Sequence, residues 1–486
     1  MLDNRQSQVR WSYFSTFSTA GMQLLAVATI TRFLQPRDYG LAAMAMVCYS
    51  LTGYFTQLGM GRAIIQRPGL TSGNIRAAFT LSVATGLGGF LIACAISPLL
   101  ALYFKEPRLK LIFIVFSLNL VFQALSMTAG GLLRREFRIR DIAICDFLGY
   151  LLSTFGLGLP MAIKGYGVWA LVASNVSQPL IVAIAYFIAR PHSLLPSLRK
   201  QDYQHISGFG GKVTLITAVE AVGVSMDTLM LGRLVSPAVL GIYNRSVTLG
   251  WLPVYNLSGG LTRVFHPAIA RAAETSRALC KQMLMATQMQ MMALLAPTCI
   301  GAAVAAPTIV PIVLGKQWDA AIPIYQAICI VALLDASMHL PGIQLEVLSF
   351  FRRKIYVQVL FVVVWAAMIL LTVRFGVAMV ALAYAGLQFI RSIFMHWISA
   401  RSLETSLWSL LSTWVPGLVC SGVVAAALCL LQSFLPHLTI LRPTLQLLAL
   451  IICSMTLAVF MYRLFYRESV YKPWVSLFHR DAVNVS

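Results

Sequence analysis

The sequence predicts an all-α integral membrane protein of about fourteen transmembrane helices. Of its 486 residues, 59% are hydrophobic and 11% are charged, whereas soluble domains carry roughly 25% charged residues. The hydrophobic residues form long runs. A run of about 20 residues spans a bilayer, because lipid gives backbone polar groups no partner outside the helix. Lysine and arginine concentrate in alternate junctions between the runs, as they do in multi-pass membrane proteins.

The hydrophobic runs define the helices in chain order. The first run is about 23 residues long, too long for the core of a signal peptide, so we expect it to remain as the first helix. The connections are short, and the longest, 190–208 and 263–282, leave no room for a soluble catalytic domain. The predicted helices are 11–33, 39–61, 77–100, 109–132, 142–162, 167–189, 209–231, 240–262, 283–313, 319–348, 356–373, 377–399, 409–431 and 444–462.

The basic residues predict how these helices are oriented. With the N-terminus in the cytoplasm, 24 of the 37 lysines and arginines fall in inner loops or tails, and 10 fall in outer loops. Cytoplasmic loops carry an excess of both residues. The distribution therefore favours an even number of spans, with both termini in the cytoplasm.

Charge and cysteine content exclude several function classes. The net charge of +21 is scattered over helix ends, so no nucleic-acid partner is expected. The nine cysteines fall almost all inside hydrophobic runs and form no C-x-x-C pair, which predicts neither a metal site nor a disulfide. The sequence contains no Walker-type phosphate loop. We therefore expect a secondary transporter rather than an enzyme, without a cofactor, driven by an H⁺ or Na⁺ gradient or by consumption of the transported product.

Two junctions repeat along the chain. Residues 32–40, RFLQPRDYG, and residues 233–241, RLVSPAVLG, match in arginine, proline and glycine at a constant offset of 201. Gly167 matches Gly376 in the same order along the chain. Six helices per unit is an even number, so both units enter the membrane in the same orientation. This predicts two parallel six-helix bundles with a transport site between them, chance similarity of hydrophobic segments being the alternative. The predicted domains are 1–200, 201–402 and 403–486, the last holding two additional helices and a cytoplasmic tail.

The prolines and glycines of the repeated junctions are interpreted as structural. Pro36 and Pro237, with Gly40 and Gly241, are expected to shape the turns between helices. For the arginines of the same junctions, a role in an outer gate is the alternative to a structural one.

The same junctions resemble a known family. The segments TRFLQPRDYGLAAM (31–44), GMG (59–61), AIIQR (63–67), GYGVWAL (165–171) and LGIYNR (240–245) are similar to the polysaccharide transporter family. These are Wzx-type flippases of the multidrug/oligosaccharidyl-lipid/polysaccharide (MOP) exporter superfamily, and the likeness is greatest to the colanic-acid and succinoglycan exporters.

The resemblance implies a V-shaped pair of six-helix bundles around a central cavity. It also implies a flippase in the bacterial inner membrane that moves undecaprenyl-diphosphate-linked oligosaccharide, an exopolysaccharide or O-antigen repeat unit, by alternating access. The implied partners are membrane lipids and the polymerase and chain-length proteins of the export pathway. The alternative is a MATE-like cation-coupled drug or metabolite antiporter of the same superfamily. The short outer loops argue against a glycan polymerase.

Charged residues inside the predicted spans are the candidate substrate-binding residues. A charge at the bilayer centre costs about 2.5–3.5 kcal/mol, so such residues face a cavity or a partner. Lys212, Glu220 and Asp227 share one face of a predicted helix, and Arg245 lies on the next helix. We expect Lys212 and Arg245 to bind the diphosphate, with Glu220 and Asp227 holding them or carrying coupling ions. A structural ion-pair network is the alternative, and Lys212 has a second one, snorkelling to the interface. Arg62 is a further diphosphate candidate near the inner mouth, or else a topology signal.

A second polar face is a candidate for ion coupling. Asp335, His339 and Glu346 fall on one side of a predicted helix. Pro341 and Gly342 are expected to interrupt that helix and to free backbone carbonyls, which suits a proton or Na⁺ site. A polar face packed against a neighbouring helix is the alternative. Asp146 and Arg391 are single charges in other helices, and the sequence assigns them no role.

Overall fold

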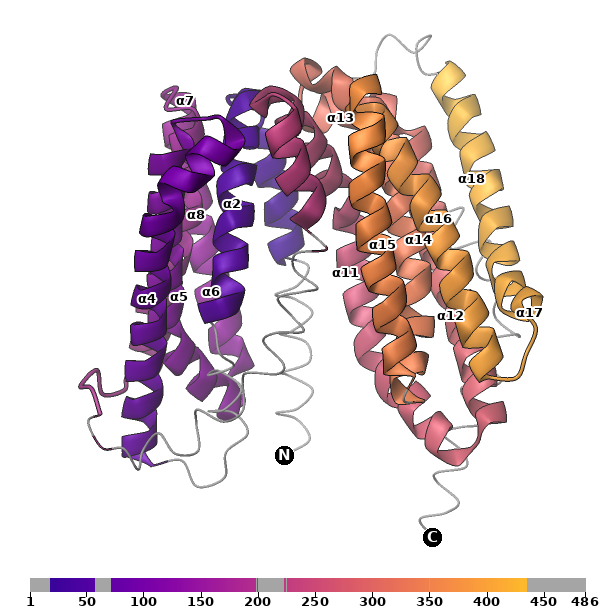
Figure 1. Cartoon of the computed structure of the whole chain (residues 1–486), viewed down its shortest axis with the longest axis horizontal. Coiled ribbons are helices and arrows are strands. Elements are labelled where there is room, and N and C mark those ends of the chain that lie inside the picture. Colours follow the sequence, from indigo (N-terminus) through magenta and orange to yellow (C-terminus); the bar gives the residue numbers. More distant parts are fainter. Residues whose placement is uncertain are drawn as a thin grey trace. The chain divides into compact units, whose positions relative to one another are not determined.

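The computed structural model describes residues 18–56, 71–197, 199, 223, 225–348 and 350–434 (Figure 1). Throughout these residues the regular elements are helices. The chain divides into two compact units, Met1–Asn244 and Arg245–Ser486. The predicted domain boundary at 200/201 lies outside the described residues, and the three predicted domains stay a prediction.

The first unit is a bundle of long apolar helices. A short apolar helix, Ser18–Ile30, precedes the labelled elements, and the helical residues 225–234 lead toward α11. The labelled elements are α2 (Pro36–Thr56), α4 (Ser72–Phe104), α5 (Leu109–Arg135), α6 (Ile139–Leu151), the π-helical turns η1 (Leu152–Gly158), α7 (Leu159–Ile163) and α8 (Val168–Ala189).

The second unit is likewise helical. Its elements are α11 (Pro237–Thr275), which begins in the first unit, α12 (Arg277–Val304), α13 (Ala306–Val313), the 3₁₀ turn η2 (Lys316–Ala321), α14 (Ile322–Val347), α15 (Phe351–Thr372), η3 (Val373–Phe375), α16 (Val377–Ser402), α17 (Leu407–Leu411), η4 (Ser412–Trp414) and α18 (Val415–Phe434).

Nine helices of the described residues are long and apolar enough to cross a membrane. They match predicted helices, although their ends extend several residues further in places. The predicted helix 444–462 lies outside the described residues, as does most of 209–231. The count of fourteen and the repeat arrangement therefore stay predictions.

Local sequence determines where several helices begin. Thr71 caps α4, because its side chain accepts the backbone N–H of Asn74 while the Asn74 side chain accepts that of Thr71. Gly167 and Gly376, the matched glycines of the repeat, directly precede α8 and α16 with φ of +56° and +97°. Glycine adopts this left-handed backbone without the steric cost that other residues meet. Both helices therefore start at a turn that the glycine makes possible.

The carbonyl that Pro98 leaves free inside α4 is satisfied by a side chain. Pro98 has no N–H to donate to the carbonyl of Cys94, one turn earlier in α4. The hydroxyl of Ser97 donates to that carbonyl instead, at 2.8 Å. Membrane helices tolerate proline where side chains restore the lost bond in this way.

Burial differs strongly between the helices of the second unit. Of the membrane-span window in η2 and α14, 72% is buried, against 22% for α15 and 28% for α16. A hydrophobic cluster of α12 and α14 residues, including Leu284, Met292 and Leu333, forms the core of this unit. Helix α14 is therefore internal, and much of α15 and α16 faces the surroundings.

Candidate functional site

The predicted substrate-binding residues are only partly within the described chain. Lys212, Glu220 and Arg62 lie outside it. Arg245 is half-buried in α11. Their predicted roles at a diphosphate stay predictions.

Asp227 is held by neighbouring hydroxyl and amide groups. One carboxylate oxygen accepts the hydroxyl of Tyr243 at 3.1 Å, and the other accepts the backbone N–H of Thr228 at 2.7 Å. Tyr243 is completely buried in α11. The bond therefore holds the helical residues 225–234 against the first turns of α11, as expected for consecutive helices joined by a short connection.

Asp335 belongs to a membrane-buried network that joins three helices. Its Oδ1 accepts the side-chain amide of Gln388 at 2.9 Å and lies 3.8 Å from Nη1 of Arg391. Arg391 also donates to Gln358 in α15 at 2.6 Å and to Gln388 at 3.3 Å. Its guanidinium lies over the ring of Phe361, 4.3 Å from the centroid. The network thus connects α14, α15 and α16 through one positive and one negative charge.

Arg391 is a residue of this network to which the sequence analysis assigned no role. The signal that points to it is the charge opposite to Asp335 in another span, because charges inside a membrane pair with one another. Hydropathy alone does not give the rotation of α16 about its axis relative to α14. The partner becomes visible only when the two helices are placed side by side.

A second polar layer begins at Ser337, two residues after Asp335 on α14. Pro341 leaves the carbonyl of Ser337 without its helical donor, and the amide of Gln288 donates to this carbonyl at 2.9 Å. The same amide lies 3.1 Å from Nε2 of the fully buried His396. The hydroxyls of Ser337 and Ser392 are 3.0 Å apart. Helices α12, α14 and α16 are therefore joined by side-chain hydrogen bonds.

A third layer lies near the ends of α14 and α16. Ser399 donates to the amide oxygen of Gln344 at 2.7 Å, and the Gln344 amide donates to Ser402 at 2.8 Å. The three layers make a continuous polar seam between α14 and α16, formed mostly by Gln and Ser. The sequence analysis missed this seam, although amides and hydroxyls at a spacing of about one or two turns were a visible signal.

The residues predicted for ion coupling are placed differently from one another. Asp335 is half-buried in the network, His339 is exposed, and Glu346 is half-buried one residue before the end of α14. The expectation that Pro341 and Gly342 interrupt the helix was wrong, since α14 continues to Val347. The carbonyl freed by Pro341 accepts the Gln288 amide, which explains why the helix needs no break there.

The repeated junctions meet in the first unit. A Cβ on Gly40 would lie 1.7 Å from the carbonyl oxygen of Pro237, and a Cβ on Gly241 would lie 1.8 Å from that of Pro36. Pro36 and Pro237 are the first residues of α2 and α11. The contact is therefore reciprocal, and only glycine allows the two backbones to approach this closely.

The sequence matches a known family over more than half of its length. Residues 29–323 match the family described as "Polysaccharide biosynthesis protein". The chain belongs to this family. The resemblance seen in the junction motifs is thereby confirmed.

Two relatives show how far the similarity extends. The chain is 24% identical over 437 residues to the lipopolysaccharide biosynthesis protein WzxC of Escherichia coli (strain K12), covering 84% of each chain. It is 22% identical over 342 residues to the teichuronic acid biosynthesis protein TuaB of Bacillus subtilis (strain 168), covering 69% of this chain and 70% of TuaB.

Solved structures share the fold of this family member. The lipid II flippase MurJ, in an inward closed conformation, matches with a TM-score of 0.69 at 12% identity, over 94% of this chain and 100% of MurJ. An inward-facing multidrug resistance MATE transporter of the MOP superfamily matches with a TM-score of 0.55 at 13% identity, over 82% of this chain and 94% of that chain. With nine apolar spans among the described residues, the protein is an all-helical multi-pass membrane protein with a MOP fold.

Proposed function

We propose that this family member is a flippase for undecaprenyl-diphosphate-linked oligosaccharide in the bacterial inner membrane. The observation that carries the proposal is the family match over residues 29–323. The name of WzxC, aligned over 84% of the chain, places that relative in lipopolysaccharide biosynthesis. The likeness to MurJ supports a fold on which a lipid-linked sugar is flipped.

The proposal includes orientation and mechanism. Both termini lie in the cytoplasm, about fourteen helices cross the membrane, and two parallel six-helix bundles alternate access to a central cavity. The chain works as a secondary transporter and catalyses no chemical change. Lys212, Arg245 and Arg62 bind the diphosphate, because arginine's planar fork donates two bonds to one phosphate group.

Ion coupling is a further part of the proposal. Asp335 is the candidate proton or Na⁺ carrier, since its carboxylate lies within a span, 3.8 Å from the guanidinium of Arg391. His339 and Glu346 are candidate neighbours along the same helix. Glu220 and Asp227 are the candidates in the predicted helix 209–231.

A deletion strain tests the proposed substrate. We expect lipid-linked oligosaccharide to accumulate on the cytoplasmic side, and export to return with a plasmid copy of the gene. A copy with Arg245→Ala should restore less than about one tenth of export, because the variant loses one charge-assisted hydrogen bond to the diphosphate. Normal membrane insertion of this variant is the control. If the deletion leaves the lipid-linked oligosaccharide unchanged but raises sensitivity to organic cations, the MATE-like antiporter is the correct function.

A further inference from the structure

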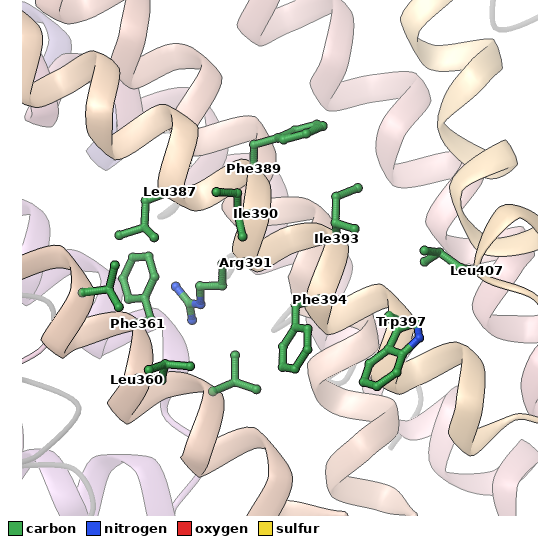
Figure 2. Close-up of a pocket in the computed structure, with 12 residues that line it drawn as sticks. Leu360, Phe361, Leu387, Phe389, Ile390, Arg391, Ile393, Phe394, Trp397 and Leu407 are labelled. Carbon is green, nitrogen blue, oxygen red and sulfur yellow. The ribbon is translucent and has the colours of Figure 1, made fainter. Parts of the chain in front are cut away.

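We infer that a groove on the flank of α15 and α16 is a docking site for the polyisoprenyl diphosphate end of a carrier lipid. The inference rests on the proposed function and names a site for its lipid outside any cavity between bundles. The groove has a volume of about 740 Å³, within the range of roughly 300–1,000 Å³ of small-molecule sites. Figure 2 shows Arg391, Phe394 and Trp397 around it, with Phe361 facing Arg391.

The groove faces the bilayer rather than the protein interior. Its floor includes Phe361, which is 7% exposed, while Leu360 and Ile390 on its walls are 61% and 66% exposed. Both helices belong to the less buried spans of the second unit. A hydrocarbon chain therefore enters sideways from the membrane.

The groove has the length of one leaflet. Leu387 and Trp397 both line it on α16, and ten residues of helix rise about 15 Å. Half of the hydrocarbon core of a bilayer is also about 15 Å thick. In the proposed orientation the Trp397 end lies at the cytoplasmic interface, so the occupant comes from the inner leaflet.

The interface end of the groove carries positive charge. The guanidinium of Arg401 lies over the ring of Trp397, 4.1 Å from its centroid. Arg401 is exposed, and no carboxylate of the described chain lies within ion-pair distance of it. The exposed guanidinium of Arg401, beside the aromatic end of the groove, suits an anionic headgroup such as a diphosphate.

The walls next to this charge favour an isoprenoid over a phospholipid. Phe394, Ile393 and Ile390, which precede Trp397 on α16, line the groove on the side of Arg391. In a phospholipid, two ester groups separate the phosphate from the chains and would meet these apolar side chains. In a polyisoprenyl diphosphate the hydrocarbon begins at the phosphate itself. Arg391, in the floor, already donates to Gln358 and Gln388, so the groove leaves one compatible arrangement: diphosphate at Arg401 and isoprenoid chain toward Arg391.

Photocrosslinking of the full-length protein tests the groove. The photoreactive amino acid p-benzoylphenylalanine replaces Ile390 in the groove or, as the matched control, Leu382, which is 55% exposed on the same helix but outside the groove. The protein is reconstituted in phosphatidylcholine nanodiscs with radiolabelled undecaprenyl diphosphate. We expect at least about tenfold more labelling at 390 than at 382, and an approximately tenfold loss with Arg401→Gln, the loss of one charge-assisted bond.

Competition distinguishes the possible occupants. Unlabelled undecaprenyl diphosphate should abolish the labelling, while excess phosphatidylglycerol or inorganic diphosphate should not. Displacement by phosphatidylglycerol, equal labelling at both positions, or crosslinking of position 390 to residues 435–486 in place of lipid overturns the inference. The deletion strain is scored separately. Accumulated lipid-linked oligosaccharide without labelling of the groove retains the flippase function and rejects the groove as a lipid site. Labelling of the groove without accumulated lipid-linked oligosaccharide rejects the flippase function alone.

Discussion

Arg391 shows how a single charge is kept inside a span. Its guanidinium has two glutamines, one carboxylate and one aromatic ring around it. Each partner lowers the cost of holding a charge in an apolar medium, and together they come from three helices. The residue therefore stabilises the arrangement of α14, α15 and α16 and keeps the floor of the groove in place.

Breaking this pair on one side should destabilise the protein. Arg391→Ala leaves the Asp335 carboxylate without its counter-charge, at an expected cost of about 3–5 kcal/mol. The double variant Asp335→Asn, Arg391→Gln removes both charges and should recover most of the thermal stability in detergent. His339→Ala, at an exposed position of α14, is the control. Equal losses in the single and double variants would show that the pair contributes nothing.

We expect His192, which lies outside the membrane-spanning segments, to make the stability of the protein depend on pH. It packs between the rings of Phe79 and Phe187, at centroid distances of 5.1 and 5.5 Å. Burial lowers the pKa of His192 below its usual value of about 6.5, the backbone carbonyl of Ser193 opposes this, and the charge of Arg190 adds to it.

The sign of the effect follows from proton binding. Near and below pH 6.5 the unfolded chain binds a proton that the folded chain resists, so stability is full above that pH. It falls as the pH drops toward the lowered pKa. The melting temperature in detergent should therefore fall between pH 7.5 and 5.5, and His192→Phe, which keeps the aromatic packing, should reduce that fall. An unchanged pH profile in the variant would contradict the assignment.

At the scale of helices, small residues and backbone carbonyls decide how closely elements approach. The α2–α11 crossing depends on Gly40 and Gly241 in the same way from both sides. In α4, a Cβ on Gly86 would lie 2.8 Å from the carbonyl oxygen of Leu120 in α5. Such close contacts replace the hydrophobic driving force that is missing between helices in lipid.

Alanine at Gly40 or Gly241 should separate α2 from α11. The added Cβ has no space beside the opposing proline carbonyl, so the helices must move, at a cost of at least about 1–3 kcal/mol. Gly88→Ala is the matched control, because its Cβ would meet nothing within 4 Å. Thermal stability and crosslinking of cysteines placed in α2 and α11 measure the change. Alanine at Gly40 without loss of either would refute the contact.

Several features of these elements were predictable from the sequence. The hydrophobic runs predicted the described spans, because backbone satisfaction in lipid allows little other than helices. The offset of 201 between the repeated junctions drew attention to Gly40 and Gly241. The partners were not predictable: a proline such as Pro341 frees a carbonyl by its chemistry, but only the packing of α12 on α14 assigns Gln288 to it. Hydropathy fixes depth in the membrane more firmly than rotation about the helix axis.

At the scale of the whole molecule, the parity of the spans determines which surface faces which compartment. Each span reverses the side of the next connection. An error of one helix would therefore move Arg401 and the charged end of the groove to the outer face. The arrangement of basic residues is the only sequence signal that fixes this parity.

Alkaline phosphatase fusions test the parity directly, because the enzyme is active only outside the cytoplasm. Fusions after Gly165, Gly315 and Gly376 should be active, and fusions after Phe137 and His192 inactive, since the predicted spans alternate between these connections. A fusion after the last residue reports on 444–462: if this segment returns the chain to the cytoplasm, the activity disappears. An active fusion at the last residue would leave an odd number of spans and contradict the proposed topology. An active fusion after His192 would reverse the membrane orientation of the first unit. The lipid in the groove would then no longer be expected to come from the inner leaflet.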